Sequence, residues 1–164
     1  MVNILTVMNI PTTPVGFHSL QAYFTVRDAA KAIQFYCELF GGEEILRLAM
    51  PDGTTLMHAE VRIGDSVLML SEENLEWGNK SPVTLGGSPV SLMHYVPAVD
   101  DVFAKAVAMG CQPIMPPAEM FWGDRFCKFV DPFGHIWAVA THVKDPTPEE
   151  MEAGRKAMFE GDCT

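Results

Sequence analysis

The sequence has few basic residues and no long apolar run. Lys and Arg total 11 against 21 Asp and Glu, which gives a formal net charge of -10. Because neutralisation of a phosphate backbone needs clustered Lys and Arg, we expect no nucleic-acid partner. No apolar stretch approaches the roughly 20 residues that span a bilayer, so we expect no membrane partner either.

The cysteines are few and scattered, and the common catalytic fingerprints are absent. Cys37, Cys111, Cys127 and Cys163 form no Cys-x-x-Cys pair. This pattern predicts reduced thiols and a cytoplasmic protein. Residues 1–15 lack the positively charged segment that opens a signal peptide. The sequence also contains no phosphate-binding loop, dinucleotide fingerprint, Ser-His-Asp order or Cys-His pair.

What the sequence does contain is an internal repeat with a spacing of about 70 residues. The segment F-T-V-R-D at 24–28 opens a strand, a helix that ends at Gly41, and three further strands. The segment H-Y-V-P-A at 94–98 opens the same order, with a helix that ends at Gly110. The apolar positions of residues 29–40 recur at helical spacing. This repeat predicts an α+β fold of two βαβββ modules whose curved half-sheets surround a cleft.

Composition divides the chain into four segments. We expect the first module in residues 17–73, a polar linker rich in Gly, Asn and Pro in 74–88, the second module in 89–143 and an acidic tail in 144–164. In the second module, Pro116-Pro117 is expected to end the strand that begins at Gln112. Pro148 is expected to begin a short helix in the tail.

Several motifs resemble one family. V-R-D-A-A-K-A-I-Q-F-Y at 26–36 and D-P-F-G-H-I-W at 131–137 resemble the vicinal oxygen chelate superfamily. That group includes glyoxalase I, extradiol dioxygenases and the bleomycin- and fosfomycin-resistance proteins. H-A-E-V-R-I-G-D-S-V-L-M-L, L-G-G-S-P-V-S-L and M-F-W-G-D-R are similar to its PhnB-like branch. The resemblance implies the two-module fold and a homodimer, sometimes with whole modules exchanged between chains.

The resemblance also gives a test for a metal site. Members that use a metal place one ligand, usually His, Gln or Glu, on each of four inward strands. The corresponding positions here are Gln21, Met69, Ser91 and Ala138. This set suits neither a hard ion nor zinc, so we expect no metal there. The alternative is a divalent metal at a non-standard site, for example at His58 and Glu60, which share one face of a strand.

Strand alternation predicts which side chains line the cleft. Those with ligand-binding potential are Gln21, Tyr23, Met69, Ser91 and Tyr95, with His142 at the cleft end of the last strand. An apolar pocket with a few placed polar groups suits a small aromatic or amphipathic molecule. The alternative is a cleft filled by its own side chains. His94 is expected beneath the second helix, and His135 is expected to cap its turn.

The loop at 121–125 is the other candidate. Trp122 and Arg125 can stack on a planar ligand or pair with an anionic one. Alternatively, Trp122 plugs the end of the barrel and Arg125 pairs with Asp124 or Asp131.

Three functions follow. The sequence favours metal-independent binding of a small molecule in the cleft. The alternatives are a glyoxalase-like lyase or isomerase with a non-standard metal or an acid–base set drawn from His58, Glu60 and His142, and a structural module with a collapsed cleft.

Overall fold

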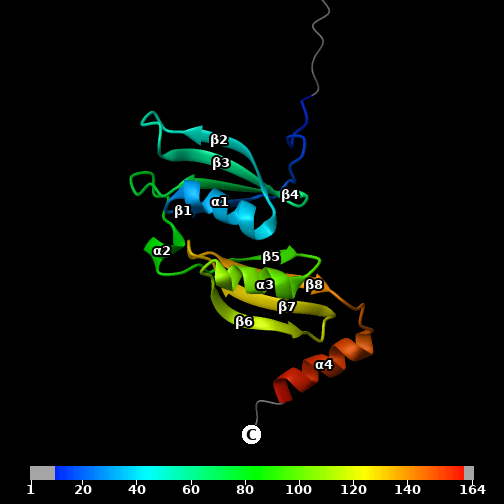
Figure 1. Ribbon diagram of the computed structural model, residues 1–164. Helices are drawn as coiled ribbons and strands as arrows, with labels where there is room; N and C mark the ends of the chain where they lie inside the picture. Colours follow the sequence, from blue (N-terminus) through cyan, green and yellow to red (C-terminus); the bar gives the residue numbers. More distant parts are fainter. Residues whose placement is uncertain (1–9, 161–164) are drawn as a thin grey trace, which may run out of the picture.

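The computed structural model describes residues 10–160, which form two four-stranded sheets and four helices (Figure 1). The first module contains β1 (Ala22–Val26), α1 (Ala29–Phe40), β2 (Glu43–Ala49), β3 (Leu56–Ile63) and β4 (Ser66–Glu72). The second contains β5 (Ser91–Tyr95), α3 (Val99–Ala108), β6 (Gln112–Glu119), β7 (Asp124–Val130) and β8 (Ile136–His142). α2 (Pro82–Leu85) lies between them, and α4 (Pro148–Glu160) follows. The prediction of two βαβββ modules is confirmed.

Both sheets have the same topology, in the orders β1-β4-β3-β2 and β5-β8-β7-β6. In each module the first and last strands are parallel, which requires a crossover, and α1 or α3 begins it. The registers also correspond, since Tyr23 lies opposite Met69 and Met93 lies opposite Ala138. The strand β6 continues past Pro116, contrary to expectation. It is an edge strand with register shifts on either side of Met115, and edge strands tolerate proline.

One core joins the two modules. α1 packs its buried face on the first sheet, and its Tyr36 and Phe40 also contact Trp137 of β8, with ring centroids 5.7 and 4.6 Å apart. Figure 1 shows α1 between the two sheets. Both sheets therefore turn their helix-covered faces toward this core. The opposite face of each sheet, which we call its open face, lies on the outside, so the two open faces do not enclose a cleft within residues 10–160.

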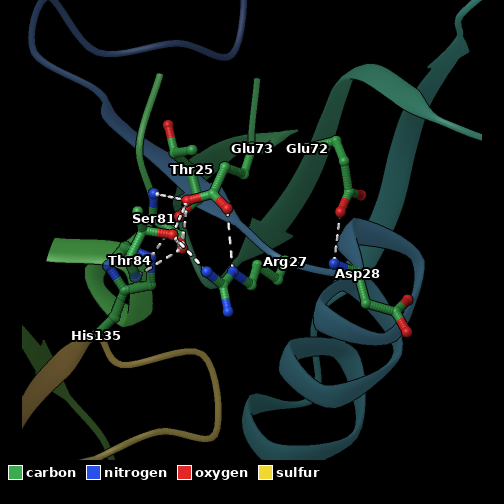
Figure 2. A network of polar contacts seen from close by, with 8 residues as sticks. All are labelled: Thr25, Arg27, Asp28, Glu72, Glu73, Ser81, Thr84 and His135. Atoms are coloured by element: carbon green, nitrogen blue, oxygen red, sulfur yellow. Dashed lines mark hydrogen bonds and ion pairs between the residues drawn. The ribbon is translucent and has the colours of Figure 1, made fainter. Parts of the chain in front are cut away.

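The end of β4 fixes both α1 and the linker. The Glu72 carboxylate accepts hydrogen bonds from the backbone N–H groups of Asp28 and Ala29, 2.6 and 2.8 Å away, at the start of α1. The next residue, Glu73, points the other way and accepts from Arg27, Ser81 and Thr84 (Figure 2).

These contacts hold α2 against the first module. The hydrogen bonds of Glu73, led by that of Thr84, lower the pKa of its carboxyl to about 2. Part of the polar linker predicted at 74–88 is thus an ordered connection. None of the helices within residues 10–160 combines the length and apolar character that crossing a membrane requires.

Candidate ligand-binding site

Most of the predicted site residues are divided between the two open faces, and Gln21 and Arg125 lie elsewhere. Tyr23 and Met69 lie on the first open face together with His58 and Glu60, because Tyr23, Met69 and Glu60 are successive cross-strand partners. The second open face carries four of the other predicted residues, namely Ser91, Tyr95, Trp122 and His142. The structure thus forms two clusters where the sequence suggested one cleft.

On the first open face, three side chains form a hydrogen-bonded chain. Tyr23 Oη lies 2.9 Å from Nδ1 of His58, and Nε2 of His58 lies 3.1 Å from Oε1 of Glu60. The side chains of His58 and Glu60 are 19% and 13% exposed. The predicted pair of His58 and Glu60 is therefore extended by Tyr23, which is 53% exposed at the outer end.

A cavity of about 450 Å³ adjoins this chain. Its walls come entirely from the first module and the start of the linker: Tyr23, Leu48, Met50, Thr55, Leu56, Met57, His58, Ser71, Glu72, Glu73, Asn74, Trp77 and Asn79. The loop that carries Trp77 is closed by a pair of backbone hydrogen bonds between Asn74 and Asn79. Mostly apolar walls with a few polar groups are the usual composition of a small-molecule site.

Ser71 is the unexpected member of this cavity. Its side chain is buried, with the residue 5% exposed, and its Oγ has no hydrogen-bond partner among the described residues. A buried hydroxyl without a partner costs about 1–3 kcal/mol. Ser71 lies opposite Thr25 in the β1–β4 register, so it shares the open face with Tyr23 and Met69. A ligand atom that accepts or donates a hydrogen bond would satisfy this group.

On the second open face, Asp124 is the common acceptor. Its carboxylate is buried and accepts from Tyr95 Oη at 3.0 Å and Trp122 Nε1 at 3.1 Å, and it lies 2.8 Å from Nδ1 of His142. Nε2 of His142 lies 3.0 Å from Asp145. The hydrogen bond to Asp124, followed by that to Asp145, raises the pKa of His142. The carboxylate fixes the orientation of three side chains that the sequence analysis proposed separately.

Arg125 does not belong to this cluster. Its guanidinium forms two hydrogen bonds with the Asp100 carboxylate of α3, at 2.6 and 2.7 Å. The alternative partners considered for Arg125, Asp124 and Asp131, are therefore wrong. The reason is strand alternation: β7 begins at Asp124, so Arg125 points to the opposite, helix-covered face.

Trp122 packs against neighbouring rings in addition to donating its hydrogen bond to Asp124. Its ring makes edge contacts with Phe121 and Phe126, with centroids 5.1 and 5.9 Å apart. Phe121 in turn lies directly beneath Gly154 of α4, where an added Cβ would come within 2.2 Å of the phenylalanine Cβ. Aromatic rings therefore cover the end of the second sheet, the packing that the plug alternative for Trp122 requires.

Comparison with known proteins places this architecture in a family. Residues 17–139 match the Glyoxalase/Bleomycin resistance protein/Dioxygenase superfamily. The chain belongs to that superfamily. It is 35% identical to the uncharacterized protein Mb0911c of Mycobacterium bovis over 146 residues, which cover 87% of this chain and 95% of that one.

Two solved structures of the same fold are similar at lower identity. Protein PA1353 of Pseudomonas aeruginosa shares 23% identity with a TM-score of 0.63, over 77% of this chain and all of the other (100%). The PhnB protein of Bacillus cereus shares 19% with a TM-score of 0.59, over 76% and 99%. At these identities the likeness establishes the fold alone.

The donor set does not fit the metal position that the superfamily resemblance implies. Met69 offers a thioether and Ala138 only a methyl group, and neither binds a hard divalent ion. Gln21, the best donor of the four, gives its side-chain N–H to the carbonyl of His18 at 3.2 Å. It lines a smaller cavity between the modules, of about 240 Å³, which also includes Trp137. Ser91 is exposed at the start of β5.

Two further histidines have structural positions. His94 packs edge-on against Phe40 of α1, with centroids 5.0 Å apart, and burial lowers its pKa. His135 was expected to cap its turn, and it does not. It stacks on Phe24 of the first module with centroids 3.6 Å apart, and the turn is held by the Asp131 carboxylate, which accepts from the Phe133 and His135 N–H groups.

Sequence reasoning missed Ser71, Trp77 and Asp124. Ser71 has the same parity as Met69, so its place on the same face could be predicted once the strand was extended by one residue beyond Leu70. Trp77 lay within the expected linker, and its place beside the cavity depends on the Asn74–Asn79 turn. Asp124 was considered only as a partner for Arg125, because a buried acidic residue has no signature in composition.

Proposed function

We propose that this protein binds a small aromatic or amphipathic molecule, without a metal, in the cavity beside Tyr23 and Trp77. The observation that carries the proposal is the Ser71 hydroxyl, which is buried in a mostly apolar wall and has no partner within residues 10–160. The aromatic rings of Tyr23 and Trp77 provide stacking surface. Among the residues that the structure describes, no Lys or Arg lines the cavity, so a neutral or cationic ligand suits it better than an anion.

We further propose that the protein belongs to the PhnB-like branch, that it is cytoplasmic and that it forms a homodimer. The two open faces expose Tyr23 and Tyr95, which are 53% and 58% exposed, together with Met57 and Met93. Apolar surface of this kind favours association. The first open face of one chain can cover the second open face of its partner, which would bring the Asp124 cluster opposite the cavity. Sedimentation equilibrium should then give twice the chain mass of 18.1 kDa; a monomer at micromolar concentration contradicts this arrangement.

The binding proposal is tested by Ser71→Ala with a set of neutral aromatic fragments such as phenol, aniline and indole. Without ligand, the variant should match or exceed the wild-type stability, by up to about 1 kcal/mol, because an unpaired buried hydroxyl has been removed. Fragments that raise the wild-type melting temperature should raise that of the variant less.

Ser66→Ala is the matched control, since Ser66 is exposed at the other end of β4. It should respond to the fragments as the wild type does. Two results contradict the proposal: no fragment stabilises the wild type, or the fragments stabilise Ser71→Ala to the same extent.

A further inference from the structure

The chain of Tyr23, His58 and Glu60 has a defined direction. A carboxylate accepts hydrogen bonds and cannot donate one. When the imidazole of His58 is neutral, its proton lies on Nε2, because this nitrogen faces Oε1 of Glu60 at 3.1 Å. Nδ1 is then the free acceptor, and Tyr23 Oη, 2.9 Å away, donates to it. A proton leaving Tyr23 therefore has a basic nitrogen in place, and Glu60 stabilises the imidazolium that results.

The second module shows that folding does not require the hydrogen bonds between Tyr23, His58 and Glu60. In the first sheet, Tyr23 and Glu60 both lie opposite Met69, one on each side. In the second sheet, Met93 and Lys128 lie in the same way on either side of Ala138. By this correspondence the equivalents of Tyr23, His58 and Glu60 are Met93, Phe126 and Lys128. The same fold thus forms in the second module without any of these three groups. We therefore look for their role in function rather than in folding.

The chain also ends where a ligand would lie. Tyr23 and His58 both line the cavity, and so does Ser71, whose hydroxyl has no partner in the described part of the chain. The inner groups are shielded, since the Glu60 side chain is 13% exposed. One end of the chain is therefore accessible to a bound molecule while the charged end is protected, an arrangement that favours proton transfer over simple binding.

We propose that the cavity is a general-base site in which Tyr23 removes a proton from a carbon acid. The Tyr23 proton passes to Nδ1 of His58 as the phenol oxygen takes the substrate proton, and the imidazolium pairs with Glu60. Ser71 donates to the substrate atom on which negative charge develops. The proton then returns to another atom of the same molecule or leaves with an eliminated group, so no co-reactant is required. The substrate class is a small planar compound with an acidic C–H, and the inference rests on the binding cavity proposed above.

The probe is 5-nitrobenzisoxazole, a planar carbon acid. Removal of its ring C–H proton breaks the N–O bond and yields 2-cyano-4-nitrophenolate, which is followed by visible absorbance. The wild type should accelerate this elimination at least about a hundredfold over buffer. Tyr23→Phe and His58→Gln should each lower kcat at least about tenfold with little change in KM. Glu60→Gln should also lower kcat with little change in KM, because an amide can orient the imidazole but does not stabilise the imidazolium charge.

Controls separate catalysis from binding and folding. Ser66→Ala should keep the wild-type rate, and thermal melts should show that each variant is folded. Binding of unreactive 5-nitroindole, followed by tryptophan fluorescence, should be equal in the wild type and Tyr23→Phe. Binding without turnover would overturn the general-base site and leave the binding function intact, whereas absence of both would overturn both. An unchanged rate in Tyr23→Phe would overturn the role of Tyr23.

Discussion

Tyr36 of α1 donates a hydrogen bond from its Oη to Oδ2 of Asp131, 2.7 Å away, across the boundary between the modules. The buried Asp131 carboxylate also accepts from Trp137 Nε1 at 2.9 Å and from the backbone N–H groups of Phe133 and His135. A buried charge is tolerated when its hydrogen bonds are satisfied. Burial, followed by the charge of Asp131, raises the pKa of Tyr36, so its phenol remains a donor.

Tyr36→Phe should therefore lower the free energy of unfolding by about 1.5–3 kcal/mol, the range for a hydrogen bond to a charged group. Urea denaturation measures this change. Tyr23→Phe is the matched control, because Tyr23 is exposed and its loss should cost less than about 1 kcal/mol. A loss below about 0.5 kcal/mol in Tyr36→Phe would show that the contact does not hold the modules together.

Trp122→Ala should lower stability by about 2–3 kcal/mol. The ring is partly buried against Phe121 and Phe126 and donates to Asp124, so its removal opens a cavity and leaves an acceptor short of one partner. Trp122→Phe should cost less, because a ring remains. Thermal denaturation measures both changes. An unaltered melting temperature in Trp122→Ala would restore Trp122 as a ligand-stacking residue.

The free energy of unfolding should decrease as the pH falls from about 7 to 5. Burial lowers the pKa of His94 and of His135, so near the ordinary value of about 6.5 the unfolded chain takes up protons that the folded chain does not. His142 acts in the opposite sense: its raised pKa gives stability at low pH that is lost as the pH rises through that pKa. His94→Gln should flatten the acid side of a urea-midpoint profile; an unchanged slope would contradict the assignment.

Gly154→Ala should detach α4 without unfolding the sheets. An alanine Cβ would lie 2.2 Å from the Phe121 Cβ, which is closer than atoms can approach. At other helix positions, replacing Gly by Ala raises stability by about 1 kcal/mol. A loss of stability in Gly154→Ala would therefore show that the close contact with Phe121 is present. Trypsin should cleave at Arg155 and Lys156 faster in the variant than in the wild type. Ala157→Gly, which weakens the helix away from Phe121, should leave most of that protection in place.

The sequence predicted the modules well because each element has local causes. The helix at 29–40 follows from its apolar spacing and from Gly41, which adopts φ 66° at the helix end. Strand alternation also placed Tyr23 and Met69 on one face. What alternation could not give is which face of each sheet meets the other module. That choice depends on Trp137 and Phe40 packing together, a contact between residues about 100 positions apart in the chain.

The candidate site was predictable only in part for the same reason. His58 and Glu60 were recognised as a pair because they are two residues apart on one strand. Their extension to Tyr23 requires knowing that β1 and β3 flank β4. The error at Arg125 came from treating residues 121–125 as one loop, although β7 already begins at Asp124. A difference of one residue in a strand boundary reverses the face on which a side chain lies.

The opposed carboxylates of Glu72 and Glu73 have a consequence for dividing the chain. Glu73 connects β4 to Ser81 and Thr84 (Figure 2), so α2 belongs mechanically to the first module although it follows the sheet. A cut directly after Glu73 would separate the carboxylate from Ser81 and Thr84 and leave it with only the Arg27 donor that lies in the same fragment. A cut after Gly87 would preserve every one of these contacts. Two half-length fragments intended to reassemble should therefore be separated at that glycine.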